Sequence, residues 1–161
     1  MFMLISCKSE MHGQDRKCLG FLEGQDVYFD TSPLIYFLDR VEIFFDISLP
    51  FFQAIESNLF QPFSSDLCMA EMLVKPLRLK DNQQTTVIQN FFDSGYFRVL
   101  SHNKQVFELA AHIRATQQLK MVDALHAATA IHHGCQFFLT SDIEIARKLN
   151  GINVIDLNAF L

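Results

Sequence analysis

The sequence predicts an α/β fold with a central, mostly parallel sheet, and two observations support this. From about Gln25 onward, short apolar runs of strand length alternate with longer amphipathic stretches, which is the pattern of βα units. In addition, the chain has 161 residues, of which half are apolar and 19% are charged. This is enough to bury the core of a single domain, and it is unlike the composition of a disordered chain.

The chain also divides at about Gln25. We expect one domain over residues 25–161, preceded by an extension over residues 1–24. The extension mixes an apolar start with Gly13, Gly20, Gly24 and scattered charges. A hairpin, a loosely held arm and an upstream continuation of the domain are all compatible with this segment.

The first strand is the apolar run at 27–29, which ends at Asp30. Ser32 and Pro33 then supply an N-cap and a first-turn proline for a helix over 32–38. The next expected elements are a helix at 50–58, a strand at 61–64 and a helix at 65–74 that Pro76 stops.

Helical spacing returns at 82–93 and closes with Ser94 and Gly95, before a third strand at 96–100. A long helix is expected at 103–118, since its apolar positions fall largely on one face. The remaining elements are a helix at 123–133 ended by Gly134, a strand at 136–139, a helix from a capping box of Ser141 and Glu144 to residue 149, and a strand at 152–155.

Targeting and redox features are absent from the sequence. No apolar run approaches the roughly 20 residues that cross a bilayer. The apolar start lacks a basic flank and is too short for a signal peptide, so we expect a cytoplasmic protein with no membrane contact. The four cysteines lie far apart without a C-x-x-C pair, which argues against a zinc knuckle or a dithiol motif and favours reduced, buried thiols.

Four acidic residues are placed where a ligand site of an open α/β sheet lies, outside the carboxyl ends of the strands. Asp30 and Asp142 directly follow predicted strands, Glu71 lies one to two turns into the helix after the second strand, and Asp123 opens the helix before the fourth. Each also has a simpler explanation. The three aspartates lie near helix starts, where the dipole stabilises a negative charge by about 0.3–1 kcal/mol. Glu71 precedes Lys75 by four residues, which suits a surface ion pair.

The sequence around these acids resembles the PIN-domain nucleases. The resemblance covers about residues 25–161 and rests on four motifs that occur in the family's order and spacing. They are VYFDTSPLIY at 27–36, AEMLVKPL at 70–77, VDALHAATA at 122–130 and FLTSD at 138–142. Ser32 stands where many members carry Asn.

This resemblance implies a three-layer α/β/α domain that hydrolyses RNA phosphodiesters and leaves a 5′ phosphate. Asp30, Glu71, Asp123 and Asp142 would be the catalytic residues and the ligands of Mg²⁺ or Mn²⁺, hard ions that prefer carboxylate and water oxygens. Such ions activate water and stabilise the leaving oxygen. The residues expected to orient the carboxylates from behind are Thr31, Ser32 and Ser141.

The resemblance extends to VapC-like toxins, and it implies a small antitoxin partner and a homodimer. A housekeeping RNA-processing nuclease and a catalytically silent RNA-binding or scaffold module are the alternatives. A phosphatase with Asp30 as nucleophile is disfavoured, because the second Asp expected two residues later is Ser32.

Other residues of the sequence bear on RNA binding and metal binding. Lys75, Arg78 and Arg114 would contact phosphates, or else form a solvated face. The net charge of −5 is unusual for an RNA-binding protein, but bound cations would offset it locally. We expect a histidine metal site at neither His126 nor the two histidines of the last helical turn. The paired phenylalanines favour core or partner packing, and an exposed groove at 44–52 would be a docking site for an antitoxin.

Overall fold

A computed structural model describes residues 19–161, and they form a five-stranded sheet in the order β3-β2-β1-β4-β5 with every pair parallel. The predicted parallel sheet is therefore confirmed. The strands are β1 (Asp26–Phe29), β2 (Gln61–Ser65), β3 (Arg98–Leu100), β4 (Phe137–Thr140) and β5 (Asn153–Asp156).

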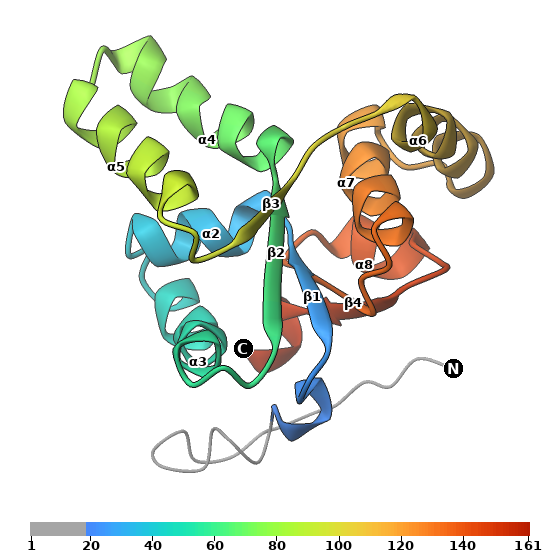
Figure 1. The fold of residues 1–161 in the computed structure, drawn as a ribbon, viewed down its shortest axis with the longest axis horizontal. Helices are drawn as coiled ribbons and strands as arrows, with labels where there is room; N and C mark the ends of the chain where they lie inside the picture. Colours follow the sequence, from blue (N-terminus) through green and yellow to red (C-terminus); the bar gives the residue numbers. More distant parts are fainter. Residues whose placement is uncertain (1–18) are drawn as a thin grey trace.

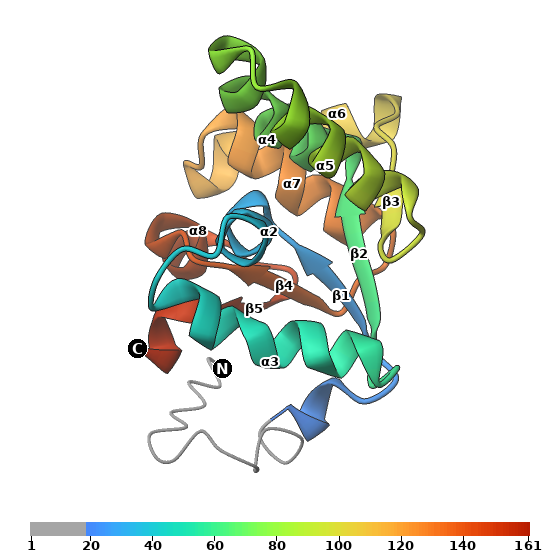
Figure 2. The ribbon, with the colours of Figure 1, turned by 90° about the vertical axis from the view of Figure 1, so that its left-hand side faces the viewer.

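Helices cover both faces of this sheet, which confirms the three-layer α/β/α architecture. Figure 1 shows α2 to α5 on one side of the central strands and α6 to α8 on the other, and Figure 2 gives the same arrangement turned by 90°. The helices are α2 (Thr31–Leu38), α3 (Phe44–Glu56), α4 (Asp66–Leu79), α5 (Asn82–Asp93), α6 (Lys104–Gln117), α7 (Met121–His132) and α8 (Ile143–Lys148).

The strand order reverses direction between β1 and β4. The chain runs outward from β1 to β3 and then returns to β4 and β5 on the other side of β1. Because parallel connections are right-handed, this reversal sends the helices of the two halves to opposite faces. It also creates a switch point at the carboxyl ends of β1 and β4, the position where ligands bind in such sheets.

The apolar residues of the two central strands form the middle of the core. Tyr28, Phe29 and Phe138 are fully buried, which explains why these strands read as continuous apolar runs. Phe51 and Phe52 on α3 are also buried, and Phe52 stacks on Phe37 with ring centroids 3.6 Å apart. Phe51 and Phe52 therefore pack into the core, and the docking role of the 44–52 region stays a prediction.

Two prolines lie inside helices, although the sequence predicted helix boundaries at both. The helix expected to start at Pro50 begins at Phe44, and the helix expected to stop before Pro76 continues to Leu79. A proline inside a helix lacks an N–H donor and costs about 3 kcal/mol. In both helices tertiary burial offsets this cost, since α3 buries an apolar face and Pro76 is itself buried.

Two helix N-caps also differ from the prediction. Asp30 caps α2 and Asp142 caps α8, in place of Ser32 and Ser141. Each aspartate accepts a hydrogen bond from the main chain of the first turn through its side chain. Since Asp, Asn and Ser cap helices about equally well, propensity alone does not distinguish these neighbouring positions.

The segment before β1 is described only from Leu19. Leu19 and Leu22 are buried, and the 3-10 helix η1 (Gly20–Leu22) leads into β1. Residues 1–18, with Cys7 and Cys18, lie outside the described residues, so most of the expected extension stays a prediction. Cys68 and Cys135 are unpaired and buried, as expected. No helix within residues 19–161 combines the length and apolar character needed to cross a membrane.

Candidate active site

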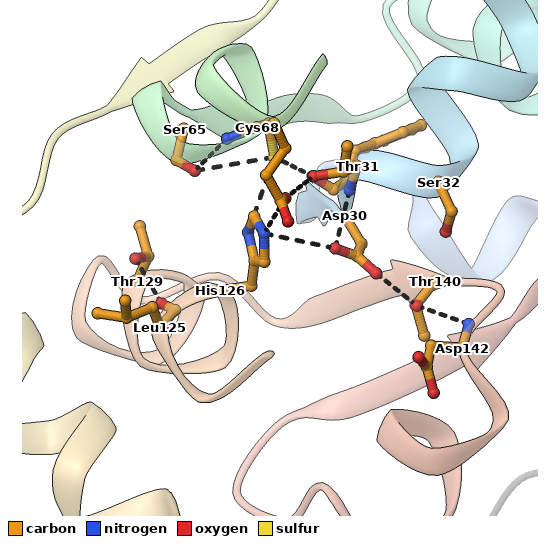
Figure 3. Close-up of polar contacts among 12 residues, drawn as sticks. Asp30, Thr31, Ser32, Ser65, Cys68, Leu125, His126, Thr129, Thr140 and Asp142 are labelled. Carbon is orange, nitrogen blue, oxygen red and sulfur yellow. Dashed lines mark hydrogen bonds and ion pairs between the residues drawn. The ribbon is translucent and has the colours of Figure 1, made fainter. Parts of the chain in front are cut away.

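Asp30 occupies the switch point directly after β1. Its backbone N–H donates to Leu139 O at 2.9 Å, which continues the pairing of β1 with β4. Its Oδ1 accepts from Thr31 N at 2.8 Å and its Oδ2 accepts from Thr140 Oγ1 at 2.7 Å (Figure 3). The side chain is therefore held from both sides, and the residue is only 7% exposed.

Glu71 reaches the same point from α4. Its Oε2 accepts from Thr31 Oγ1 at 2.5 Å and from His126 Nε2 at 2.7 Å. Burial would raise the pKa of Glu71, but the hydrogen bonds from His126 and Thr31 outweigh it and lower the pKa. No ion pair joins Glu71 to Lys75 within the described residues. Thr31 thus connects the two acids, because its backbone N–H donates to Asp30 and its hydroxyl donates to Glu71.

Asp123 lies in the first turn of α7 and carries the clearest sign of a missing partner. Its Oδ2 is buried and accepts no hydrogen bond from any residue that the structure describes. Burial, then the charges of Asp142 and Asp30, raise the pKa of its carboxyl. An unsatisfied carboxylate oxygen facing two other carboxylates is costly unless a cation accompanies it.

Asp142 joins the group through Thr140. The Thr140 hydroxyl accepts from Asp142 N at 3.0 Å while it donates to Asp30. Asp142 Oδ1 is occupied by the backbone of α8, where it accepts from Glu144 N at 2.7 Å and from Ile145 N at 3.2 Å. Asp142 Oδ1 therefore caps α8, where Ser141 was the predicted cap, and its second oxygen remains for another role.

Ser32 and Ser141 connect the two sides of the switch point. Their hydroxyl oxygens lie 2.8 Å apart, and Ser141 N donates to Ser32 Oγ at 3.3 Å. The Asn158 side chain donates to Ser141 O at 2.7 Å. These contacts fix the β4–α8 loop, which carries Asp142, against the start of α2.

The four predicted acids thus lie around one edge of the sheet, but they do not form a ready-made metal cage. No group of three His, Cys, Asp or Glu side chains within residues 19–161 is arranged to hold an ion. The donor set nonetheless fits a hard divalent cation, because it offers carboxylate oxygens and Asp123 Oδ2 has no partner among the residues that the structure describes. Their role as metal ligands stays a prediction.

His126 belongs to this site, and the sequence reasoning missed it. It is 1% exposed, and its Nε2 also lies 3.8 Å from Asp30 Oδ1. Burial alone would lower its pKa, but the Cys68 thiol and the carboxylates of Glu71 and Asp30 raise it well above the usual value. The available signal in the sequence was its position among the small residues Ala124, Ala127, Ala128 and Ala130. In the structure these alanines are fully buried in α7.

The residues predicted to contact phosphates lie on two different helices. Lys75 and Arg78 are exposed on α4, beyond Glu71 on the same helix. Arg114 Nη1 instead donates to Leu119 O at 3.3 Å, which supports the turn between α6 and α7. Only the two α4 residues therefore extend the site along one helix.

The fold and the site together define an α/β/α domain whose acidic centre lies at the switch point of a parallel sheet. The model of the PIN domain family matches residues 27–149, and the chain belongs to this family. PIN domains are generally nucleases.

Solved structures of similar fold agree with this assignment. VapBC2 from Rickettsia felis, bound to a DNA fragment from its promoter, superposes with a TM-score of 0.65 and 13% identity, covering 81% of this chain and 98% of that chain. FitAcB from Neisseria gonorrhoeae gives 0.64 and 17%, over 81% and 97%. VapC20 from Mycobacterium tuberculosis, a toxin that cleaves the sarcin-ricin loop, gives 0.62 and 14%, over 79% and 98%. No curated protein matches the sequence.

Proposed function

We propose that this protein is a divalent-metal-dependent endoribonuclease, acting in the cytoplasm as the toxin of a VapBC-like toxin–antitoxin pair. The observation that carries the proposal is the buried Oδ2 of Asp123, which lies near Asp142 and Asp30 and has no hydrogen-bond partner within residues 19–161. A buried carboxylate oxygen without a partner lowers the stability of the fold, but it is useful as a ligand in a site that binds a cation.

Asp30, Glu71, Asp123 and Asp142 would hold Mg²⁺ or Mn²⁺, directly or through water. When bound, the ion supplies an activated water and neutralises the charge that develops on the phosphate. Thr31 and Thr140 orient the carboxylates of Asp30 and Glu71. Lys75 and Arg78 attract the RNA backbone toward this edge of the sheet.

Two observations support the toxin role. The fold is similar to that of a toxin–antitoxin complex from Klebsiella pneumoniae and of VapBC-5, a member of the VapBC toxin–antitoxin family from Mycobacterium tuberculosis, and the antitoxin partner is inferred from that similarity. The chain also exposes large apolar side chains on α4, where Val74, Leu77 and Leu79 are 51%, 60% and 66% exposed. Such a surface suits a protein partner, either an antitoxin or a second copy in a homodimer. A housekeeping RNA-processing nuclease or a silent RNA-binding module would share the fold.

A cleavage assay tests the enzyme. The purified protein is freed of metal with EDTA and mixed with 3′-labelled RNA, with and without Mn²⁺. We expect Mn²⁺-dependent cuts that leave 5′ phosphates, and none with Asp123→Asn. Asp93→Asn, which changes an exposed aspartate at the end of α5, is the matched control. Cleavage that persists in EDTA, or in Asp123→Asn, would contradict the proposal.

Expression in a bacterial host tests the toxin. Growth arrest by the wild-type chain but not by Asp123→Asn, relieved by the product of the neighbouring gene, supports that role. Metal-dependent cleavage in vitro without arrest would favour the housekeeping nuclease. Absence of cleavage with RNA binding retained would favour the silent module.

A further inference from the structure

His126 uses both ring nitrogens in contacts with buried or half-buried polar groups. Nε2 lies 2.7 Å from Glu71 Oε2, and Nδ1 lies 2.8 Å from the hydroxyl of Tyr28. A carboxylate only accepts hydrogen bonds, so Nε2–H is the donor to Glu71. The Tyr28 hydroxyl in turn lies 2.8 Å from Ser65 Oγ. Ser65, Tyr28 and His126 are all buried. A continuous series of hydrogen bonds therefore connects Ser65 through Tyr28 and His126 to Glu71.

The two donors to Glu71 meet on one oxygen. Thr31 Oγ1 and His126 Nε2 both donate to Oε2, and no hydrogen bond from the described residues reaches Oε1. The terminal torsion of a Glu side chain is broad when nothing restrains it. Two donors on a single oxygen remove that freedom and leave the other oxygen available for a ligand.

Tyr28 fixes the ring that makes this contact. It is fully buried in β1, and its aromatic ring stacks on Phe138 with centroids 5.3 Å apart. Its hydroxyl therefore has a constant position in the core, and it holds the His126 ring from the side opposite to Glu71. Groups behind a metal ligand that orient it commonly change metal affinity by about 10- to 100-fold when they are removed.

We propose that His126 is a positioning residue for Glu71, itself oriented by Tyr28, and that it sets the affinity of the site for a divalent cation. This inference rests on the proposed function, in which Glu71 is a metal ligand. His126 acts through Glu71 and does not itself contact the ion. The sequence motif at 122–130 thus contributes a second polar side chain to the site besides Asp123.

Mn²⁺ affinity, measured without RNA from the electron paramagnetic resonance signal of free Mn²⁺, tests the inference. We expect His126→Phe to weaken binding about 10- to 100-fold. His126→Gln, which keeps an N–H donor near the Nε2 position, restores most of the affinity. His132→Gln changes an exposed histidine on the same helix and leaves the affinity unchanged. Circular dichroism and melting in EDTA verify that each variant is folded.

A double-mutant cycle tests the role of Tyr28. Tyr28→Phe removes one hydroxyl and should weaken Mn²⁺ binding in the wild-type background, but not in the His126→Phe background, because its effect passes through the imidazole. If His126→Phe does not fold, His126→Gln replaces it in the cycle, since Gln lacks the ring nitrogen that contacts Tyr28. Equal effects of Tyr28→Phe in both backgrounds would overturn this part of the inference.

The inference and the proposed function fail in different ways. Wild-type protein that binds Mn²⁺ and cuts RNA, beside a folded His126→Phe variant of unchanged Mn²⁺ affinity, would overturn the positioning role alone. The same conclusion follows if His126→Gln is as weak as His126→Phe. Wild-type protein that neither binds Mn²⁺ nor cuts RNA would overturn both.

Discussion

Asp123 on α7 is close enough to Asp142, the N-cap of α8, for the two carboxylates to repel each other. Burial and this repulsion raise the pKa of Asp123, and its Oδ2 has no partner among residues 19–161. Asp123 lies in the first turn of α7 and Asp142 lies between β4 and α8, so only the tertiary fold brings the two residues together. The repulsion is a cost of the metal-free fold, and a neutral side chain at position 123 removes it.

Asp123→Asn should relieve this cost. In EDTA we expect the free energy of unfolding to be unchanged or higher by about 1 kcal/mol, a rise in Tm of up to roughly 4 °C. The stabilisation that Mn²⁺ gives the wild type should be lost. Thermal melts with EDTA and with Mn²⁺ measure both effects, and Asp93→Asn is the control. A large loss of metal-free stability would show that the ionised carboxylate holds the fold together.

Asp30→Asn should abolish cleavage, as Asp123→Asn does, but unlike Asp123→Asn it should lower the stability of the metal-free protein. The amide oxygen still caps α2 by accepting from Thr31 N. The new NH₂ group, however, faces the Thr140 hydroxyl, which already accepts from Asp142 N. We expect a loss of about 1 kcal/mol in EDTA from the disturbed hydrogen bond, and no cleavage. Chemical denaturation and the RNA assay measure these, and a variant that still cleaves would remove Asp30 from the site.

Lys75 and Arg78 should contribute to RNA binding through charge alone. RNA binding is measured in the Asp123→Asn background, which prevents cleavage. Lys75→Gln and Arg78→Gln should each make the negative slope of log K for RNA binding against log salt shallower by about 0.7. Lys104→Gln is the control, because Lys104 is exposed on α6 and pairs with Glu108 at 3.5 Å. Parallel salt plots for wild type and variants would show that the RNA takes another path.

Stability should fall in alkaline solution because the thiol of buried Cys135 and the phenol of half-buried Tyr96 keep their protons to higher pH in the folded chain. Burial raises the pKa of Cys135 from 9.0 to about 12 and that of Tyr96 from 10.0 to about 12. The unfolded chain therefore loses these protons first, so stability declines as the pH rises from about 9 toward 12. Cys135→Ala should flatten the lower part of this decline in urea titrations. An unchanged slope would show that Cys135 ionises equally in both states.

The sequence by itself determined the parallel α/β architecture, the order of its elements and the positions of the four acids at strand ends or in the first turns of helices. Each of these depends on local information: apolar runs of strand length, helical spacing, and motifs such as DTS at 30–32. The packing of Phe51 and Phe52 into the core also agreed with their expected role. Helix starts such as those at Asp30 and Asp142 were off by one or two residues, because neighbouring capping residues compete on nearly equal terms.

Only the tertiary structure decided the rest. Pro50 and Pro76 stay inside helices because burial of an apolar face, a property of the whole fold, offsets the lost backbone hydrogen bond. His126 becomes part of the site through contacts with Tyr28, 98 residues away, and Glu71, 55 residues away. Side-chain hydrogen bonds act over about 3 Å, so they depend on where distant elements pack, and no local pattern in the chain specifies that.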